Sequence, residues 1–332
     1  MDRGGPVMRR AVPTILAASA LFFSVLGDAG PGRLPIDFTG MAAAGEPPVL
    51  RRPPEGAAAP SPAMDRPPPS TAQACRTPAE IIAATGDRDV RRLADRLADP
   101  ELCLGIVSVE GTVARWSLLV IAHRSRGGPR WVLPHDNENA AFDAGVVAVL
   151  RYGGVLVAVE SGENRMWRGI DPNRVFGSGP CGRGRADPAY TAAVLAGLDR
   201  RFPIVGLHSN ERRGGTISMA RPYPGAEAFR AASGVTPRSG APRRDDDTMV
   251  ILAGRAPATE AAARGAIAWF TERGVNILYE TVRPGRSDCS LSNHAVLAGL
   301  PRTFTVEVGH GDTASARALV DLVMQSVGIA PR

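Results

Sequence analysis

Short apolar runs alternate with stretches of helical periodicity through the last three quarters of the chain. Seven runs have the length and apolar content typical of buried strands: 116–122, 132–133, 155–159, 204–207, 249–253, 277–279 and 304–308. Apolar residues recur with helical spacing in 139–151, 188–201, 257–273 and 313–327. This alternation predicts a single α/β domain with a mixed, mostly parallel central sheet flanked by helices.

Two further segments have recognisable local patterns. Thr77 is a potential N-cap and is followed by Glu80, so a helical pattern is expected to begin there and reach Leu97. The stretch 222–247 is rich in Pro, Gly, Ser and Arg, which predicts a long loop.

The chain before residue 75 follows a different pattern. Residues 1–30 place arginines ahead of the apolar run 11–27, which is the order of a signal peptide. Residues 31–74 are rich in Pro and Ala without apolar periodicity, as in a disordered linker. We therefore predict an exported protein, periplasmic or secreted, whose folded domain covers 75–332. An uncleaved N-terminal membrane anchor is the alternative, because the apolar run has roughly the minimum length that spans a bilayer.

Composition argues against one class of partner. The formal net charge is +6, but all 39 basic residues are arginines and they are scattered along the chain. Aromatic residues make up 5%, so the sequence has no basic stripe interleaved with stacking side chains, and we predict no nucleic-acid partner. The four cysteines, an even number, permit two disulfides in an oxidising compartment, with their pairing left open: Cys75, Cys103, Cys181 and Cys289.

Three of the five histidines come at the ends of apolar runs, and one of them, His123 after 116–122, has no candidate partner nearby. His135 follows the run that ends at Pro134, and His208 follows 204–207. Open α/β sheets bind ligands at the carboxyl ends of their strands, so both imidazoles are candidates for one site. Glu138 lies three residues after His135, where a predicted helix begins. Two imidazoles and a carboxylate can bind zinc and leave a position for water, which predicts a Zn²⁺ site of His135, Glu138 and His208.

A second group of polar residues has the chemistry to bind a substrate. Asn173 and Arg174 offer an amide and a planar guanidinium, which suit a carboxylate. Arg165 and Arg168 lie just upstream, and either could stabilise an oxyanion.

One carboxylate interrupts the apolar run 304–308. Burial of Glu307 without a partner would be costly, so we expect it to face the metal site or an arginine and to act as a general base. Glu280 is the rival for this role.

The order of these motifs resembles the zinc carboxypeptidase superfamily. The motifs are His135-x-x-Glu138, Asp171-x-Asn173-Arg174-x-Phe176, Leu207-His208 and Val306-Glu307-Val308-Gly309. Within the superfamily they are similar to the succinylglutamate desuccinylase and aspartoacylase branch. That branch usually has Gly at the position of Asp136, and Pro-Gly in place of Gly177-Ser178. The resemblance further implies that Tyr279 corresponds to the family's mobile tyrosine that covers the substrate.

The resemblance implies zinc-dependent hydrolysis of an amide bond adjacent to a carboxylate. An exported enzyme of this kind would be a metallocarboxypeptidase or amidase acting on short or cell-wall peptides. One alternative is an aspartoacylase-like deacylase of N-acyl amino acids. Another is a non-catalytic domain that binds peptide ends on the same fold, although Glu307 argues against it, because binding needs no base.

Overall fold

The computed structural model describes residues 75–179, 181–182, 185–210, 217–232 and 246–332. These residues belong to the unit Pro47–Arg332. The predicted signal peptide or anchor, 1–30, and the predicted linker, 31–74, lie outside the described residues. Within the described ranges, none of the helices has the length and apolar character needed to cross a membrane.

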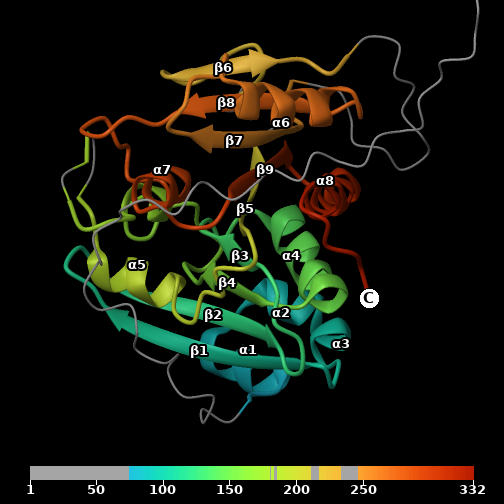
Figure 1. The fold of residues 1–332 in the computed structure, drawn as a ribbon. Coiled ribbons are helices and arrows are strands. Elements are labelled where there is room, and N and C mark those ends of the chain that lie inside the picture. Colours follow the sequence, from blue (N-terminus) through green and yellow to red (C-terminus); the bar gives the residue numbers. More distant parts are fainter. Residues whose placement is uncertain (1–74, 180, 183–184, 211–216, 233–245) are drawn as a thin grey trace, which may run out of the picture. The chain divides into compact units, whose positions relative to one another are not determined.

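Nine strands of the described residues form one mixed sheet in the order β1-β2-β4-β3-β5-β9-β7-β8-β6 (Figure 1). They are β1 (Leu102–Glu110), β2 (Arg115–His123), β3 (Arg130–Leu133), β4 (Val155–Val159), β5 (Ile204–Asn210), β6 (Ala226–Phe229), β7 (Met249–Gly254), β8 (Asn276–Thr281) and β9 (Thr303–Gly309). The neighbouring strands β4, β3, β5 and β9 are parallel, as are β7 and β8, and the remaining pairs are antiparallel. The carboxyl ends of the central parallel strands therefore lie at the same edge of the sheet.

The helices cover both faces of this sheet. They are α1 (Pro78–Thr85), α2 (Arg88–Arg92), α3 (Ala94–Leu97), α4 (Asn139–Tyr152), α5 (Pro188–Val194), α6 (Ala261–Thr271), α7 (Leu291–Leu297) and α8 (Thr313–Ser326). One apolar cluster joins one face of the sheet to α1–α4, α6 and α8, and a second joins the other face to α5 and α7. The expectation of a mixed sheet flanked by helices is confirmed. Because helices cover both faces of the sheet, β3 and β5 are buried along their whole length.

Several element boundaries differ from the sequence pattern. The helix expected over 77–97 is three short helices, because Gly86 adopts a φ of 73° and ends α1. The capping box of Thr77 and Glu80 forms as predicted. Helix α5 ends at Val194 and α6 begins at Ala261, so both are shorter than their periodicity suggests.

Two strands are additional to the predicted set of seven. β6 lies in the segment predicted as a loop. It has four residues and pairs only with β8 at the sheet edge, so its side chains are not buried and its sequence shows no apolar run. β1 is long and apolar, and the sequence analysis missed it.

The disulfide pairing, open at the level of sequence, is Cys75–Cys103 and Cys181–Cys289. The first joins the start of the described chain to β1. The second joins two loops next to the candidate site described below.

Asp187 connects α5 to the end of the sheet. Its buried carboxylate accepts hydrogen bonds from Trp116 Nε1 at 2.9 Å, from the backbone N–H of Val113 at 3.1 Å and from that of Tyr190 at 3.2 Å. Burial raises the pKa of Asp187, but these hydrogen bonds outweigh it and hold the pKa below its usual value. The ionised carboxylate is therefore the form that stabilises the fold.

Asp187→Ala should lower the free energy of unfolding by about 2–4 kcal/mol at pH 7, because three donors, two of them buried, lose their acceptor. A depressed folded-state pKa stabilises the protein above the unfolded value of about 3.9, and this contribution is lost as the pH falls through the folded value. Urea unfolding at pH 7 and at pH 3 should show the difference from wild type shrinking at the lower pH. Asp95→Ala, at an exposed position, is the control and should change little at either pH. Equal stability of Asp187→Ala and wild type at pH 7 would contradict this role.

Candidate metal centre

Three predicted ligands meet at the carboxyl edge of the central parallel strands. His135 lies just beyond β3, and Glu138 is the N-cap residue of α4. His208 does not follow its strand as expected, because β5 continues to Asn210, but it lies in the carboxyl-terminal half of β5. Since β3 and β5 are parallel neighbours, both imidazoles reach the same place.

The side chains of these residues form one tight group. Nδ1 of His135 is 2.8 Å from Oε1 of Glu138, and Nδ1 of His208 is 3.2 Å from Oε2. One potential ligand atom from each residue lies within 4.8 Å of the other two, and all three side chains are buried. No other group of three or more His, Cys, Asp or Glu side chains in the described ranges could hold a metal ion. The structure therefore brings His135, Glu138 and His208 together, as the sequence predicts.

Neighbouring groups fix the orientation of these side chains. Asp171 Oδ1 is 2.9 Å from Nε2 of His135, and the backbone N–H of Ser209 donates to Glu138 Oε2 at 3.1 Å. A second acceptor on the far side of an imidazole sets its tautomer and orients the ring. The sequence pattern gives no role to Asp171. The sequence feature that could have marked Asp171 is its position as N-cap of the short 3₁₀ helix Pro172–Arg174, which carries the predicted carboxylate-binding pair.

The electrostatics keep an anionic carboxylate between two imidazoles. Burial raises the pKa of Glu138, but the charges of His208 and His135 outweigh it and leave the pKa well below its usual range. Burial lowers the pKa of His208. Burial also raises the pKa of Asp171, but its hydrogen bond and ion pair with His135 lower it to about 2. Two imidazoles and one carboxylate, buried and already converged, are a donor set that fits a divalent metal ion.

Glu307 lies beside this group. It pairs in register with His208 on the parallel strands β9 and β5, so the two side chains are on the same face of the sheet. Its side chain is 4% exposed. Burial, followed by the negative charge of Glu138, raises the pKa of Glu307 well above its usual value. A buried carboxylate thus lies next to the candidate metal ligands, at the position where the sequence predicts the general base.

The rival carboxylate, Glu280, is in a different environment. It lies on β8, separated from β9 by β7, and accepts hydrogen bonds from Asn293 Nδ2 at 2.6 Å and from the hydroxyl of Tyr223 at 3.1 Å. Its hydrogen-bonding capacity is used by protein donors. The geometry favours Glu307 over Glu280 as the group nearer to the metal ligands.

The predicted carboxylate-binding pair borders the same group. Asn173 Nδ2 is 3.4 Å from Nε2 of His208, and Asn173 Oδ1 accepts from the backbone N–H of Leu291 at 3.0 Å. Arg174 Nε is 3.5 Å from Asp288 Oδ2, and its side chain is 38% exposed. The guanidinium is therefore held on one side and partly accessible on the other.

The two arginines upstream are placed differently. Arg165 donates to Glu138 Oε1 at 2.6 Å, so it reaches the metal ligands. Arg168 has a φ of 49° in a tight turn, and its guanidinium lies 5.9 Å from the ring centroid of Trp167. Both line an open pocket of about 730 Å³ formed by residues 160–162 and 164–169. The structure thus brings Arg165, rather than Arg168, to the candidate metal centre.

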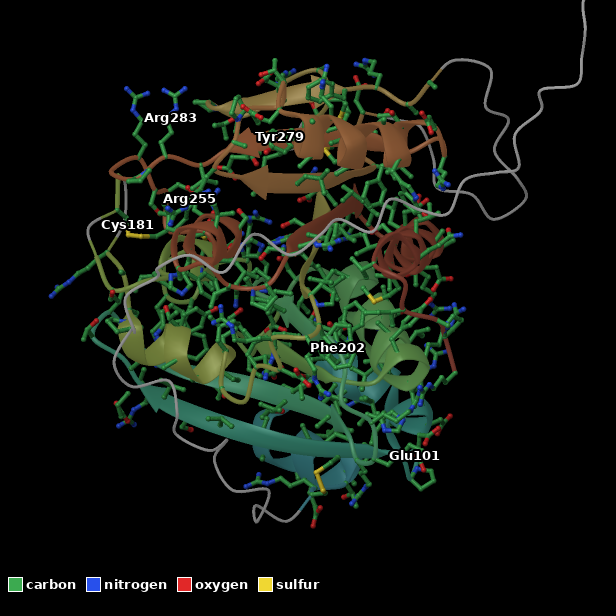
Figure 2. The ribbon with its side chains drawn as sticks, in the orientation of Figure 1. Glu101, Cys181, Phe202, Arg255, Tyr279 and Arg283 are labelled. Carbon is green, nitrogen blue, oxygen red and sulfur yellow. A yellow bond between two sulfur atoms is a disulfide. The ribbon has the colours of Figure 1, made fainter. Side chains whose placement is uncertain are left out.

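Tyr279 does not lie at this site, which corrects the role implied by the resemblance. Its hydroxyl donates to the carbonyl of Ala256 at 2.8 Å, and its ring belongs to the apolar cluster that includes Phe270 and Phe304. Figure 2 labels Tyr279. Successive strand residues point to opposite faces, so Tyr279 faces away from the side that Glu280 shares with Glu307. Tyr223, which the sequence pattern does not mark, donates its hydroxyl to Glu280 on the side of the site.

Comparisons with known proteins find distant likeness in backbone only. No protein-family model matches the sequence, and no curated protein matches it. A candidate metallopeptidase from Shewanella amazonensis is 13% identical over 77% of this chain and 95% of its own, with a TM-score of 0.38. A metallo-carboxypeptidase from Burkholderia cenocepacia is 12% identical over 72% of this chain and 68% of its own, with a TM-score of 0.36. A likeness this distant carries no argument about activity.

Proposed function

We propose that this protein is a zinc-dependent hydrolase that cleaves an amide bond adjacent to a carboxylate. The proposed activity is that of a metallocarboxypeptidase or amidase on short or cell-wall peptides. One observation carries the proposal: His135, Glu138 and His208 converge within 4.8 Å, and Glu307 lies in register beside His208. A closed structural metal site needs no base next to it, whereas hydrolysis does.

The metal would be held by His135, Glu138 and His208. Zinc bound there supplies Lewis acidity toward the scissile carbonyl and the attacking water. Asp171 holds the ring of His135 in place, and the backbone of Ser209 holds the carboxylate of Glu138. These contacts preorganise the ligands before substrate arrives.

Glu307 is the proposed general base. It takes a proton from the attacking water and returns it to the leaving amine. It lies in register beside His208, so its carboxylate is next to the proposed metal ligands, where the attacking water would be.

Arg165 is the proposed partner of the developing oxyanion. It already lies within 2.6 Å of Glu138, and a fixed positive charge there favours negative charge on the carbonyl oxygen. The open pocket that Arg165 shares with Trp167 gives the acyl side of a substrate room to bind.

Asn173 and Arg174 are the proposed carboxylate site. Arg174 presents a planar fork, and Asn173 adds an amide donor close to His208. A substrate anchored there by its free carboxylate would place the adjacent amide bond near the metal ligands. The proposed partner is therefore a peptide, or an N-acyl amino acid, with a free carboxylate.

A matched pair of substrates tests this proposal. Wild type should hydrolyse acetyl-trialanine with a free carboxylate at least tenfold faster, in kcat/KM, than the same peptide as a C-terminal amide. Arg174→Ala should lower kcat/KM for the acid by about a hundredfold, mainly through KM, because a charge-assisted bidentate contact is lost. The same substitution should leave the amide peptide unaffected.

Arg168→Ala is the control for this series, since it removes an arginine that lines the open pocket but not the proposed carboxylate site, and it should change either rate by less than about threefold. Equal loss on acid and amide peptides would contradict the carboxylate role of Arg174. A wild type that binds metal and peptide without cleaving it would point instead to a peptide-end binding domain.

The proposed place of action is outside the cytoplasm. The charged and apolar start of the sequence supports export, and the two disulfides are consistent with an oxidising compartment. Peptides that bear free carboxylates are the substrates we expect there.

A further inference from the structure

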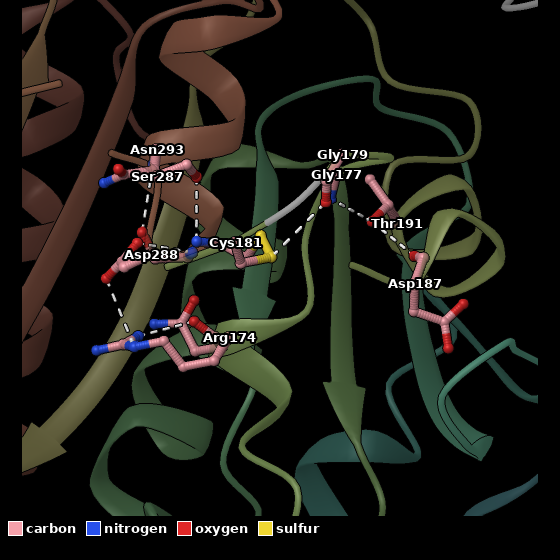
Figure 3. The surroundings of a disulfide bond; sticks show 12 residues. Arg174, Gly177, Gly179, Cys181, Asp187, Thr191, Ser287, Asp288 and Asn293 are labelled. Atoms are coloured by element: carbon pink, nitrogen blue, oxygen red, sulfur yellow. Dashed lines mark hydrogen bonds and ion pairs between the residues drawn. A yellow bond between two sulfur atoms is a disulfide. The ribbon is translucent and has the colours of Figure 1, made fainter. Parts of the chain in front are cut away.

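The Cys181–Cys289 disulfide lies beside the proposed carboxylate site (Figure 3). It joins the segment that follows Arg174 to the residue before the N-cap of α7. Two backbone hydrogen bonds accompany it, from Phe176 N–H to the carbonyl of Cys289 and from Gly182 N–H to the carbonyl of Ser287, both 2.9 Å. The two segments are thus held together by one covalent bond and two hydrogen bonds.

The loop at Cys289 holds both members of the carboxylate-binding pair. Asp288 Oδ2 faces Nε of Arg174, and the backbone N–H of Leu291 donates to Oδ1 of Asn173. Nη1 of Arg174 in turn donates to the carbonyl of Asn173 at 2.7 Å. These contacts direct the amide nitrogen of Asn173 toward His208 and fix one side of the guanidinium.

Noncovalent contacts alone hold this arrangement weakly. Arg174 and Asp288 are each 38% exposed, and solvent-exposed ion pairs of this kind restrain a side chain little. Cys289 has a φ of 57°, which side chains other than glycine seldom adopt, so the loop would be expected to relax without a restraint. The covalent link supplies that restraint.

We infer that the Cys181–Cys289 disulfide positions Asn173 and Arg174 for binding of the substrate carboxylate. Its loss weakens binding of the carboxylate and leaves the metal ligands in place, because none of them belongs to the two linked segments. The inference rests on the proposed function, in which this pair binds the substrate. One consequence is that the chain gains its full substrate affinity only in an oxidising compartment.

The test compares two disulfides of the full chain. Cys181→Ser/Cys289→Ser removes the link at the site, and Cys75→Ser/Cys103→Ser is the matched control at the other disulfide. Each is made in a Glu307→Gln background, so that the peptide is not consumed. The measurements are bound zinc per chain and the Kd values of acetyl-trialanine and of its C-terminal amide.

The expected result is a roughly tenfold or greater rise in Kd for the acid peptide in Cys181→Ser/Cys289→Ser, with Kd for the amide and bound zinc unchanged. The control should change each value by less than about twofold. An unchanged Kd for the acid, or equal weakening of acid and amide, would overturn the inference.

A second measurement covers the case in which the double variant does not fold. The Cys75→Ser/Cys103→Ser variant, also in the Glu307→Gln background, keeps Cys181–Cys289 as its remaining disulfide, so mild reduction breaks that link in an already folded chain and Kd for the acid should rise about tenfold while Kd for the amide stays the same. An unchanged Kd for the acid after reduction would overturn the inference. A wild type that binds the acid better than the amide but cleaves neither would refute the proposed hydrolysis, and the Kd comparison would still decide the role of the disulfide.

Discussion

His208→Ala should abolish metal binding and, with it, hydrolysis. His208 supplies one of three converging ligands, and its loss leaves one imidazole and one carboxylate, too few for a stable zinc site. We expect metal affinity to fall by roughly a hundredfold or more. Elemental analysis of the purified chain should show close to one zinc per chain in wild type and less than about a tenth of that in the variant.

A histidine outside the group provides the control. His310→Ala changes an exposed residue, so both zinc content and turnover should remain close to those of wild type. Circular dichroism would establish that both variants are folded. Correctly folded wild type without zinc, or a His208→Ala variant that keeps it, would refute the proposed metal centre.

Glu307→Gln should lower kcat by about 10²–10⁴, the usual contribution of a general base. The amide is nearly the same size as the carboxylate, so packing around the strand is preserved, while the group can no longer take a proton from water. Bound zinc and the Kd of the peptide should stay within about threefold of wild type, because the substitution removes neither a metal ligand nor the carboxylate site. Steady-state kinetics and zinc analysis on the same preparation measure all three quantities.

Glu280→Gln is the matched control for this variant. Glu280 is also a buried strand carboxylate, but it is hydrogen-bonded to Asn293 and Tyr223 rather than placed beside His208. We expect its kcat to stay within about tenfold of wild type. If Glu280→Gln abolishes turnover and Glu307→Gln does not, Glu280 is the base and the assignment is wrong.

Sequence reasoning succeeded where the residues of a feature lie close together in the chain. Thr77 and Glu80 form a capping box within one helical turn. His135 and Glu138 converge because a short turn joins the end of β3 to the first turn of α4. The chain between them is too short to allow a very different arrangement, so the pattern alone predicts the contact.

Sequence reasoning failed where a residue's role depends on which face of the sheet its side chain occupies. Tyr279 and Glu280 are adjacent, so only one of them can face the site, and the packing of β8 against Phe270 and Phe304 directs Tyr279 to the opposite side. Tyr223 carries no local sign of its contact with Glu280, because the two are far apart in sequence.

The sequence by itself determined the alternation of strands and helices, the residue types able to bind a metal, and the pairing of an amide with a guanidinium at Asn173 and Arg174. These depend on local periodicity and on side-chain chemistry, which the chain carries at every position. The tertiary structure alone decided that Glu307, rather than Glu280, lies beside His208 and that Cys181 pairs with Cys289. Such contacts join distant segments, and their geometry is set by strand order and by which face of the sheet each side chain occupies.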